Sequence, residues 1–354
     1  MTLMKRITLC FPPFLFLFFL PAAHAVNLAN PVVAIFGSFA GTEGRFDDFT
    51  LEALDGEDIE TSVRVINSGS GGYGLSPDLP PGSNFDLLDW YLNTPADDDT
   101  NGISDRFSER ELASGKTDER YFYTAEDGGM VFRATIGGAK TSKNTLFTRT
   151  ELREMLRRGN TDIGTRGEGD DPGKNNWVFS SAPEGTQKKA GAVDGTLRAT
   201  LAINHVTTTG DNIDVGQVVI GQIHAAKDEP ARLYYQKFPG SRRGSIYVAH
   251  EPSGGDDIFV DLLGSKSSTP IDPPDGIALD EKFSYEIRAE GNLLTVTISS
   301  AGEVRARENI DMSNSGYDVA DDFMYFKAGV YNQNLSGDPD DYVKATFYEL
   351  ENIH

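Results

Sequence analysis

The stretch KFSYEIRAEGNLLTVTISS, residues 282–300, alternates apolar and polar side chains on both sides of Gly291 and Asn292. Successive side chains of a β-strand point to opposite faces, so this alternation predicts two strands, each with one buried face. A Gly-Asn pair between two such runs is typical of a tight turn. The stretch therefore predicts an antiparallel β-hairpin.

The same period of two recurs through the second half of the chain, and no segment after residue 25 has sustained apolar spacing at three and four. The runs that predict strands are 196–206, 216–225, 231–238, 244–250, 257–263, 324–333 and 342–350. Clusters rich in Gly, Pro, Asn and Asp separate them. Many short strands without helices between them favour an antiparallel β-sandwich or β-barrel.

Residues 1–25 have the three-part layout of a secretory signal peptide, with Lys5 and Arg6, an apolar stretch and an AHA ending. A membrane anchor is the alternative interpretation, but the apolar run 14–20 is short. We expect cleavage after Ala25 and a secreted protein, extracellular or periplasmic, with no membrane contact once the signal is removed.

The only cysteine, Cys10, lies in this N-terminal segment, so the mature chain has no disulfide, thiol nucleophile or cysteine-based zinc site. Loss of Lys5 and Arg6 takes the formal net charge from −22 to −24. Such an acidic chain is not expected to bind nucleic acid. A local basic cleft remains compatible with this charge, because the field that a ligand meets is local.

A Pro-, Gly- and Ser-rich stretch, SPDLPPGSN at 76–84, marks a candidate domain boundary. Residues 26–79 are rich in Gly and acidic side chains with only scattered apolar patches, and we treat them as an N-terminal extension of unclear role. The denser part of the chain begins with NFDLLDWYLNTP (84–95). The main domain is therefore predicted to cover 80–354.

Three segments carry side chains suited to chemistry, and the first is FTRTELREML at 147–156. In a strand, Arg149, Glu151 and Arg153 share one face. The glutamate would hold the two arginines in place, and each guanidinium could offer a planar donor fork to a carboxylate. A surface ion-pair ladder is the alternative interpretation.

The second segment is GQIHA at 221–225, where Gln222 and His224 share one face of a strand. An amide beside an imidazole can bind a carboxylate and exchange a proton near neutral pH. A lone histidine in a strand is more often structural.

The third segment is MYFKAGVYNQ at 324–333, where one face carries Tyr325, Lys327, Tyr331 and Gln333. We expect neighbouring cations to lower the pKa of a phenol on this face and so to suit it to proton transfer. An aromatic platform for sugars is the alternative interpretation.

In this order and spacing, RTELREM, QIH and YFKAGVYNQ closely resemble the three signature segments of the alginate lyases of polysaccharide lyase family 7. NFDLLDWYLNTP resembles the usual start of that domain. The resemblance covers 80–354 and leaves 26–79 outside. It implies a β-jelly roll, a sandwich of two curved antiparallel sheets with a concave substrate groove. It also implies that the partner is alginate, an acidic polysaccharide.

The resemblance places Arg149, Gln222 and His224 around the substrate carboxylate and gives Tyr331 the proton transfer, with Tyr325 as the alternative tyrosine. It assigns substrate binding to Glu151, Arg153, Tyr325, Lys327 and Gln333. Such lyases cut by β-elimination, so the enzyme must stabilise charge that develops beside a carboxylate. The reaction needs no metal or other cofactor.

Ile223, the middle residue of QIH, implies by the same resemblance a preference for guluronate-containing blocks, because relatives with Val there lean to mannuronate. We expect a monomeric, endo-acting enzyme. A non-catalytic jelly-roll module that binds acidic polysaccharides is the main alternative, although it would not need Gln222 and His224. A glycoside hydrolase would need two facing carboxylates, and the close acidic spacing on offer is GEDIE at 56–60.

DDDTNG at 97–102 resembles the start of a calcium-binding loop. The twelfth position of that template would be Ser108 and not the required glutamate. An acidic surface turn is therefore the preferred interpretation.

Overall fold

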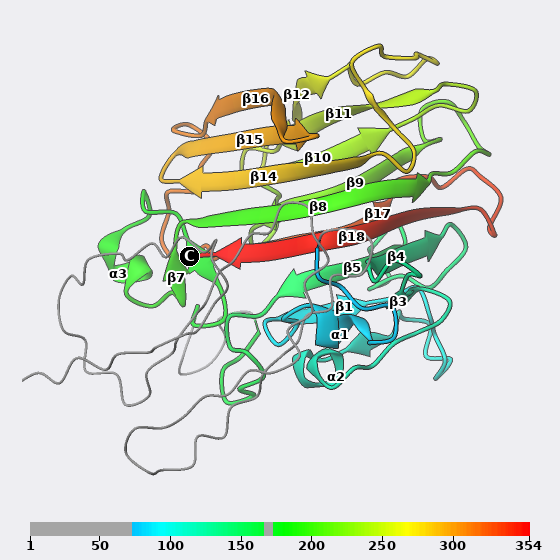
Figure 1. The fold of residues 1–354 in the computed structure, drawn as a ribbon. Helices are drawn as coiled ribbons and strands as arrows, with labels where there is room; N and C mark the ends of the chain where they lie inside the picture. The colour runs from blue at the N-terminus through cyan, green and yellow to red at the C-terminus, as the bar shows by residue number, and fades with distance from the viewer. Residues whose placement is uncertain (1–72, 166–172) are drawn as a thin grey trace, which may run out of the picture. The chain divides into compact units, whose positions relative to one another are not determined.

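The computed structural model describes residues 73–165 and 173–354. Within these residues the chain forms a nine-stranded and a seven-stranded sheet, both antiparallel, with a small two-stranded parallel sheet and three short helices (Figure 1). The expected signal peptide, residues 26–72 of the expected extension and the GEDIE segment lie outside the described residues.

The nine-stranded sheet has the order β12-β11-β10-β9-β17-β5-β1-β2, and β13 pairs with β11. Its strands are β1 (Trp90–Asn93), β2 (Arg106–Phe107), β5 (Arg149–Glu154), β9 (Gln217–His224), β10 (Ala231–Gln236), β11 (Arg243–His250), β12 (Ile258–Leu263), β13 (Ile277–Ala278) and β17 (Tyr325–Asn332). The three segments with candidate site residues therefore form the adjacent strands β9, β17 and β5.

The seven-stranded sheet has the order β16-β15-β14-β8-β18-β4-β3. Its strands are β3 (Phe122–Thr124), β4 (Met130–Thr135), β8 (Gly195–His205), β14 (Lys282–Glu290), β15 (Leu293–Ser300), β16 (Glu303–Asp311) and β18 (Tyr342–Ile353). The remaining elements are α1 (Pro81–Asn84), α2 (Glu109–Ala113), α3 (Glu184–Gln187), β6 (Trp177–Val178) and β7 (Ala192–Val193).

Each strand predicted by alternation is present, and 282–300 forms the hairpin β14–β15 with Gly291 in the left-handed region at φ 56°. Two long strands were missed. β16 is exposed or half-exposed along its whole length, although Ala306 and Ile310 pack against the core. β4 begins with three consecutive buried residues, Met130–Phe132, and alternates only from Phe132 onward. The period of two that reveals a half-buried strand is therefore weak in β16 and short in β4.

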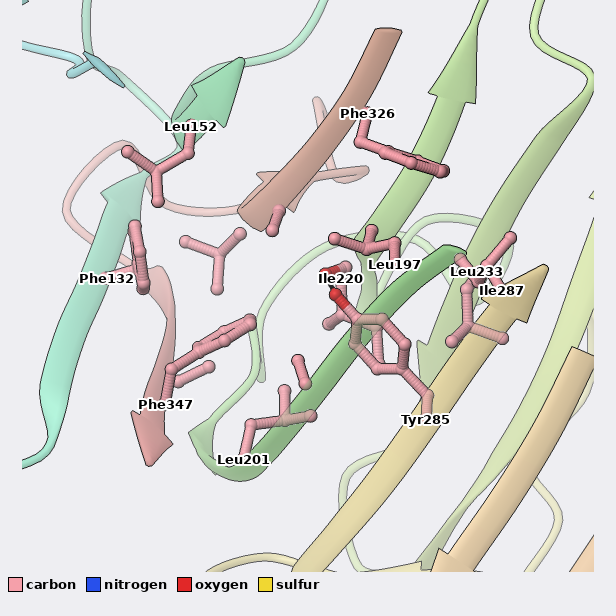
Figure 2. Close-up of a cluster of buried hydrophobic side chains, with 14 of the residues drawn as sticks. Phe132, Leu152, Leu197, Leu201, Ile220, Leu233, Tyr285, Ile287, Phe326 and Phe347 are labelled. Atoms are coloured by element: carbon pink, nitrogen blue, oxygen red, sulfur yellow. Dashed lines mark hydrogen bonds between the residues drawn. The ribbon is translucent and has the colours of Figure 1, made fainter. Parts of the chain in front are cut away.

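The two large sheets face each other across one apolar layer (Figure 2). Leu152 and Phe326 contribute from the nine-stranded sheet, and Leu201 and Phe347 from the seven-stranded sheet. The fold is thus the predicted all-β jelly-roll sandwich, and the barrel alternative is excluded.

Tyr285 ties the two sheets together, because its hydroxyl donates to the Ile220 carbonyl at 3.0 Å. Its ring lies against Gly221, where a Cβ atom would come within 2.8 Å of the phenol. A glycine in β9 therefore makes room for an aromatic ring of the opposite sheet directly behind Gln222.

The expected boundary near residue 80 falls within the packed domain. Tyr73 stacks on Tyr348 with ring centroids 5.4 Å apart, and Leu75 is buried in the core. Residues 73–79 of the expected extension therefore pack with the main domain.

The acidic stretch 97–102 forms a turn. The Asp97 carboxylate accepts hydrogen bonds from the backbone N–H groups of Asn101 and Gly102 at 2.8 and 3.0 Å. Across residues 73–165 and 173–354, no group of three or more acidic, histidine or cysteine side chains is placed to hold a metal ion. In that same part of the chain, no helix is long and apolar enough to cross a membrane.

Candidate active site

Strand register brings the predicted residues onto one face of the nine-stranded sheet. On β17, Lys327 lies opposite Gln222 of β9 on one side and Arg153 of β5 on the other. Tyr325 pairs with His224. Directly opposed residues have Cβ atoms about 4.5–5.5 Å apart, so these side chains are neighbours. We call this face, opposite the apolar layer, the site face.

Tyr331 lies further along β17, opposite Arg149 of β5 and Val219 of β9. Between these rows sits Gly329, whose φ of 137° favours glycine. A Cβ atom there would lie 2.5 Å from the Thr150 carbonyl oxygen. The glycine therefore lets β17 approach β5 closely beside Glu151.

Glu151 is the centre of the site, with only 1% of its surface exposed. Its carboxylate receives Lys327 Nζ at 2.5 Å, Arg149 Nη1 at 2.9 Å and a hydrogen bond from the Gln222 amide. Burial alone would raise the pKa of Glu151, but Lys327 and Arg149 outweigh it and hold the pKa below its usual value. The enclosed carboxylate positions its three partners, and the expected role of Glu151 in substrate binding stays a prediction.

Two cations share this one carboxylate, which leaves the cluster with a net positive charge. Burial and the nearby Arg149 guanidinium lower the pKa of Lys327 to about 8, although Glu151 opposes the shift. Arg149, Glu151 and Lys327 form a buried ion-pair network, so the alternative interpretation of a surface ion-pair ladder does not hold. The face can therefore attract a substrate carboxylate while the whole chain is strongly acidic.

Arg153 does not offer the free donor fork that was expected. Its Nη1 donates to the Glu154 carbonyl at 2.7 Å, and its Nη2 donates to the Thr165 carbonyl at 2.7 Å and to Asn176 Oδ1 at 2.6 Å. Its guanidinium lies 4.0 Å from the centre of the Tyr325 ring. Arg153 thus supports the Tyr325 ring, and its expected role in substrate binding stays a prediction.

Arg149 and Tyr331 form the other end of the site. The guanidinium lies 3.7 Å from the centre of the half-buried Tyr331 ring, close enough for a cation–π contact. The expected lowering of the phenol pKa is wrong. Burial raises the pKa of Tyr331 and outweighs Arg149, and burial raises the pKa of Tyr325 to about 12.

His224 stacks on Tyr325 with ring centroids 4.9 Å apart and planes 13° from parallel. Burial and the positive charge of Lys327 lower the pKa of His224 to about 3. The imidazole is therefore neutral at neutral pH and holds one ring proton.

Gln333 lies at the end of the site face, just beyond β17. Its amide donates to the Asn332 carbonyl at 3.0 Å, which turns it toward its own backbone. Nothing in these contacts tests its expected role in substrate binding, which stays a prediction.

Sequence reasoning missed four groups on this face. Tyr91 of β1 lies opposite Arg153, and Arg232 of β10 lies opposite Gln222. The alternation of ARLYYQ could have placed Arg232 here. Glu229 and Glu251 come from loops beside β10 and β11, where no periodic pattern marks them. Glu151 is therefore not the only carboxylate of this face, since Glu229 lies beside His224 and Glu251 beside Arg232.

The fold and this face together define the class of protein: a β-jelly roll of the polysaccharide lyase type. The family model described as alginate lyase matches residues 85–354. An alginate lyase from Klebsiella pneumoniae is 53% identical over 283 residues, which cover 77% of this chain and 91% of that protein.

Solved structures give the same picture. The crystal structure of an alginate lyase from Klebsiella pneumoniae has a TM-score of 0.74 and 52% identity, covering 78% of this chain and 98% of that one. One from Pseudomonas aeruginosa has a TM-score of 0.55 and 26% identity, covering 76% of this chain and all of that one. The chain belongs to the alginate lyases of polysaccharide lyase family 7.

Proposed function

We propose that the protein is an endo-acting lyase that cleaves the 1,4-linkages of alginate by β-elimination and prefers guluronate-containing blocks. The observation that carries this proposal is the Glu151 network, which holds Arg149, Lys327 and Gln222 together on one face beside Tyr331. Positive charge and a neutral donor gathered at one point suit a carboxylate-bearing sugar.

In the proposed reaction, Arg149 and Gln222 receive the carboxylate of the sugar that loses its C5 proton and whose C4–O bond breaks. A base takes the proton from C5, and the electrons of that C–H bond form the C4=C5 double bond. The C4–O bond breaks, its electrons go to the leaving oxygen, and that oxygen takes up a proton. The products are an unsaturated sugar end and a new hydroxyl end, with no water consumed.

Tyr331 is proposed to carry the proton. In guluronate the C5 proton and the leaving oxygen lie on opposite sides of the ring, so Tyr331 protonates the leaving oxygen while a second group, His224, takes the C5 proton. In mannuronate they lie on the same side, and one phenol could do both. A raised pKa keeps the Tyr331 phenol protonated at neutral pH, which suits it to donate a proton to the leaving oxygen. Its contact with Arg149 stabilises the phenolate.

Endo cleavage is supported by a row of side chains that crosses the sheet on both sides of Lys327. The row contains Tyr91, Arg153, Lys327, Gln222 and Arg232 on five neighbouring strands. With strands about 4.8 Å apart, it spans about 19 Å. Sugars could therefore bind on both sides of the cut bond. Ile223, buried behind this row, supports the guluronate preference through the family resemblance.

The test is incubation of the purified protein with separate polyguluronate and polymannuronate, following the absorbance of unsaturated ends and the sizes of the products. We expect faster reaction on polyguluronate and early products of mixed length. Release of only one short product from the start would overturn endo cleavage. Binding without any absorbance would instead favour the non-catalytic binding module, which no feature of the site face favours.

We further propose that the protein acts outside the cytoplasm as a monomer. The layout of residues 1–25 supports export. N-terminal sequencing of protein recovered from the medium or periplasm should begin at Val26, and light scattering should give the mass of one chain. Cell-bound protein that retains residues 1–25, or a dimer mass, would contradict these two points.

A further inference from the structure

Three basic side chains on the seven-stranded sheet have no role in the reaction described above. Arg133 of β4 lies directly opposite Lys344 of β18, and Lys344 lies opposite His205 of β8. The neighbours Ala134 and Ala345 lie in the apolar layer, so the alternation of a strand turns these three side chains to the outer face of the sheet. All three are half-exposed there.

Two tyrosines of the same face contact these groups. The ring centre of Tyr342 on β18 lies 4.1 Å from the Arg133 guanidinium and 4.1 Å from the centre of the His205 ring, with which it stacks. His205 Nδ1 donates to the Tyr342 carbonyl at 2.8 Å. The Lys344 ammonium lies 5.9 Å from the centre of the Tyr123 ring on β3. We call these five residues the outer basic cluster.

The outer basic cluster lacks the carboxylate that balances charge on the site face. Lys327 and Arg153 are also directly opposed, but there Glu151 binds Lys327. Within residues 73–165 and 173–354, neither Arg133 nor Lys344 forms an ion pair with a carboxylate. Like charges directly opposite each other destabilise a sheet, so the pair adds nothing to the fold.

The other contacts of these cations are weak. The one hydrogen bond of the Arg133 side chain in the described part of the chain runs from Nη1 to the Arg120 carbonyl and is 3.5 Å long. Asp341, directly before β18, is held elsewhere, because its carboxylate accepts from the backbone N–H groups of Thr208 and Thr209 at 2.8 and 3.0 Å. The cluster therefore presents positive charge that a ligand with carboxylate groups can bind.

The outer basic cluster lies on the far side of the sandwich from the Glu151 network. β4 and β18 pack against β5 and β17 across the apolar layer (Figure 1). With strands about 4.8 Å apart and sheets about 10 Å apart, a route around the edge at β2 and β3 measures at least about 34 Å. A chain of four sugars is too short to touch both faces at once.

We propose that the outer basic cluster is a second, non-catalytic binding surface for a polysaccharide that carries carboxylates. The inference rests on the proposed function only in naming that polymer as alginate. Arg133 and Lys344 bind carboxylates of one stretch of polymer while the site face cuts another. The enzyme thereby stays attached between cuts, because a tethered chain is present at a high effective concentration.

The test uses the double variant Arg133→Gln/Lys344→Gln and the single variant Lys344→Glu. Binding to a surface coated with polyguluronate is measured in a Tyr331→Phe background, so that the polymer is not consumed. We expect the double variant to bind about three- to tenfold more weakly at low salt, as for the loss of two exposed charge pairs. Lys344→Glu should bind at least as weakly and yet melt no lower than the parent, because its carboxylate faces Arg133.

Kinetics with Tyr331 intact give the second readout. In the double variant, KM for polyguluronate should rise by a similar factor, whereas kcat and the KM for tetraguluronate should stay at wild-type values. Arg305→Gln/Arg307→Gln is the matched control. It removes two exposed positive charges from β16, at the far edge of the same sheet, and should change neither binding nor KM.

Unchanged binding in both cluster variants would overturn the inference. So would an equal loss in the β16 control, because the cause would then be overall charge, or a raised KM for tetraguluronate, because the effect would then pass through the site. A dimer that the double variant abolishes would show that the cluster binds a second copy of the chain instead. Wild-type protein that binds the coated surface but forms no unsaturated ends would contradict the proposed function alone.

Discussion

Two buried glutamates of β5 show how one strand serves both chemistry and fold. Glu151 lies on the site face with 1% exposure, and Glu154 lies on the opposite, core-facing side with 0%. Glu151 is held by two cations and one amide. The Glu154 carboxylate is held by neutral donors and one histidine, which are Trp177 Nε1, the Phe326 backbone N–H, Asn352 Nδ2 and His354 Nε2 at 2.7–3.0 Å.

The difference lies in what each carboxylate organises. Glu151 collects charge from neighbouring strands of one sheet, and the result is a positive cluster beside Tyr331. Glu154 joins β5 to β6, to β17 and to the end of β18 in the other sheet, so it connects the two layers. Loss of Glu151 should therefore damage mainly activity, and loss of Glu154 should damage mainly stability.

The largest expected effect is on the site side of this comparison. Tyr331→Phe removes the proton-transfer hydroxyl and keeps the ring against Arg149, so turnover should fall by about 10²–10⁴ with little change in the melting temperature. Initial rates of unsaturated-end formation and thermal unfolding check this. Near-wild-type turnover would show that Tyr331 is the wrong tyrosine, and Tyr325→Phe should then be assayed.

On the core side, Glu154→Gln keeps the shape of the side chain but points amide hydrogens at donor groups and leaves His354 without its carboxylate. We expect a loss of about 3–5 kcal/mol in the free energy of unfolding, as for other broken buried pairs. Urea denaturation measures it. A loss below about 1 kcal/mol would mean that the four contacts contribute little to joining the sheets.

The sequence could predict which side chains share a face of a strand, but not which partners they bind. The period of two placed Gln222 with His224 and Arg149 with Glu151 on common faces, because strand geometry fixes which side chains share a face. The hydrogen-bond and ion-pair partners of these side chains could not be predicted from the sequence. Arg153 is bound by the Thr165 carbonyl and Asn176 from distant loops, and no local pattern shows that.

Tertiary packing explains the other misses. Cations beside Tyr331 suggested a lowered pKa, but the burial that raises it depends on the whole sheet. Glu229 lies in a loop, and only the folded chain brings its carboxyl to His224. The contacts of Glu154 could not be predicted either, since its partners come from three separate segments.

A smaller effect concerns the titration of the site. Lys327, with a pKa lowered to about 8, is an ammonium below that pH and an amine above it. The positive cluster should therefore weaken as the pH rises, and kcat/KM should fall by up to about tenfold per pH unit above 8. Lys327→Arg keeps its charge in this range and should lack the decline. Parallel pH profiles for both proteins would contradict the assignment of this decline to Lys327.

The smallest expected effect concerns Ile223, a core residue directly behind the site face. Ile223 is fully buried in the core behind Gln222 and His224. Ile223→Val removes one methylene and should cost about 0.5–1.5 kcal/mol of stability. A slight shift of the two site residues should also lower the ratio of activity on polyguluronate to activity on polymannuronate. Equal ratios in the two proteins would show that Ile223 marks the preference without causing it.

The most direct test of the division between the two faces of β5 is the rate of unsaturated-end formation on polyguluronate by Glu154→Gln, expressed per folded molecule. The folded fraction comes from the urea denaturation curve of the same preparation. If Glu154 serves the fold and the Glu151 cluster serves the chemistry, the rate per folded molecule should stay close to that of wild type. A loss per folded molecule as large as that of Tyr331→Phe would contradict this account.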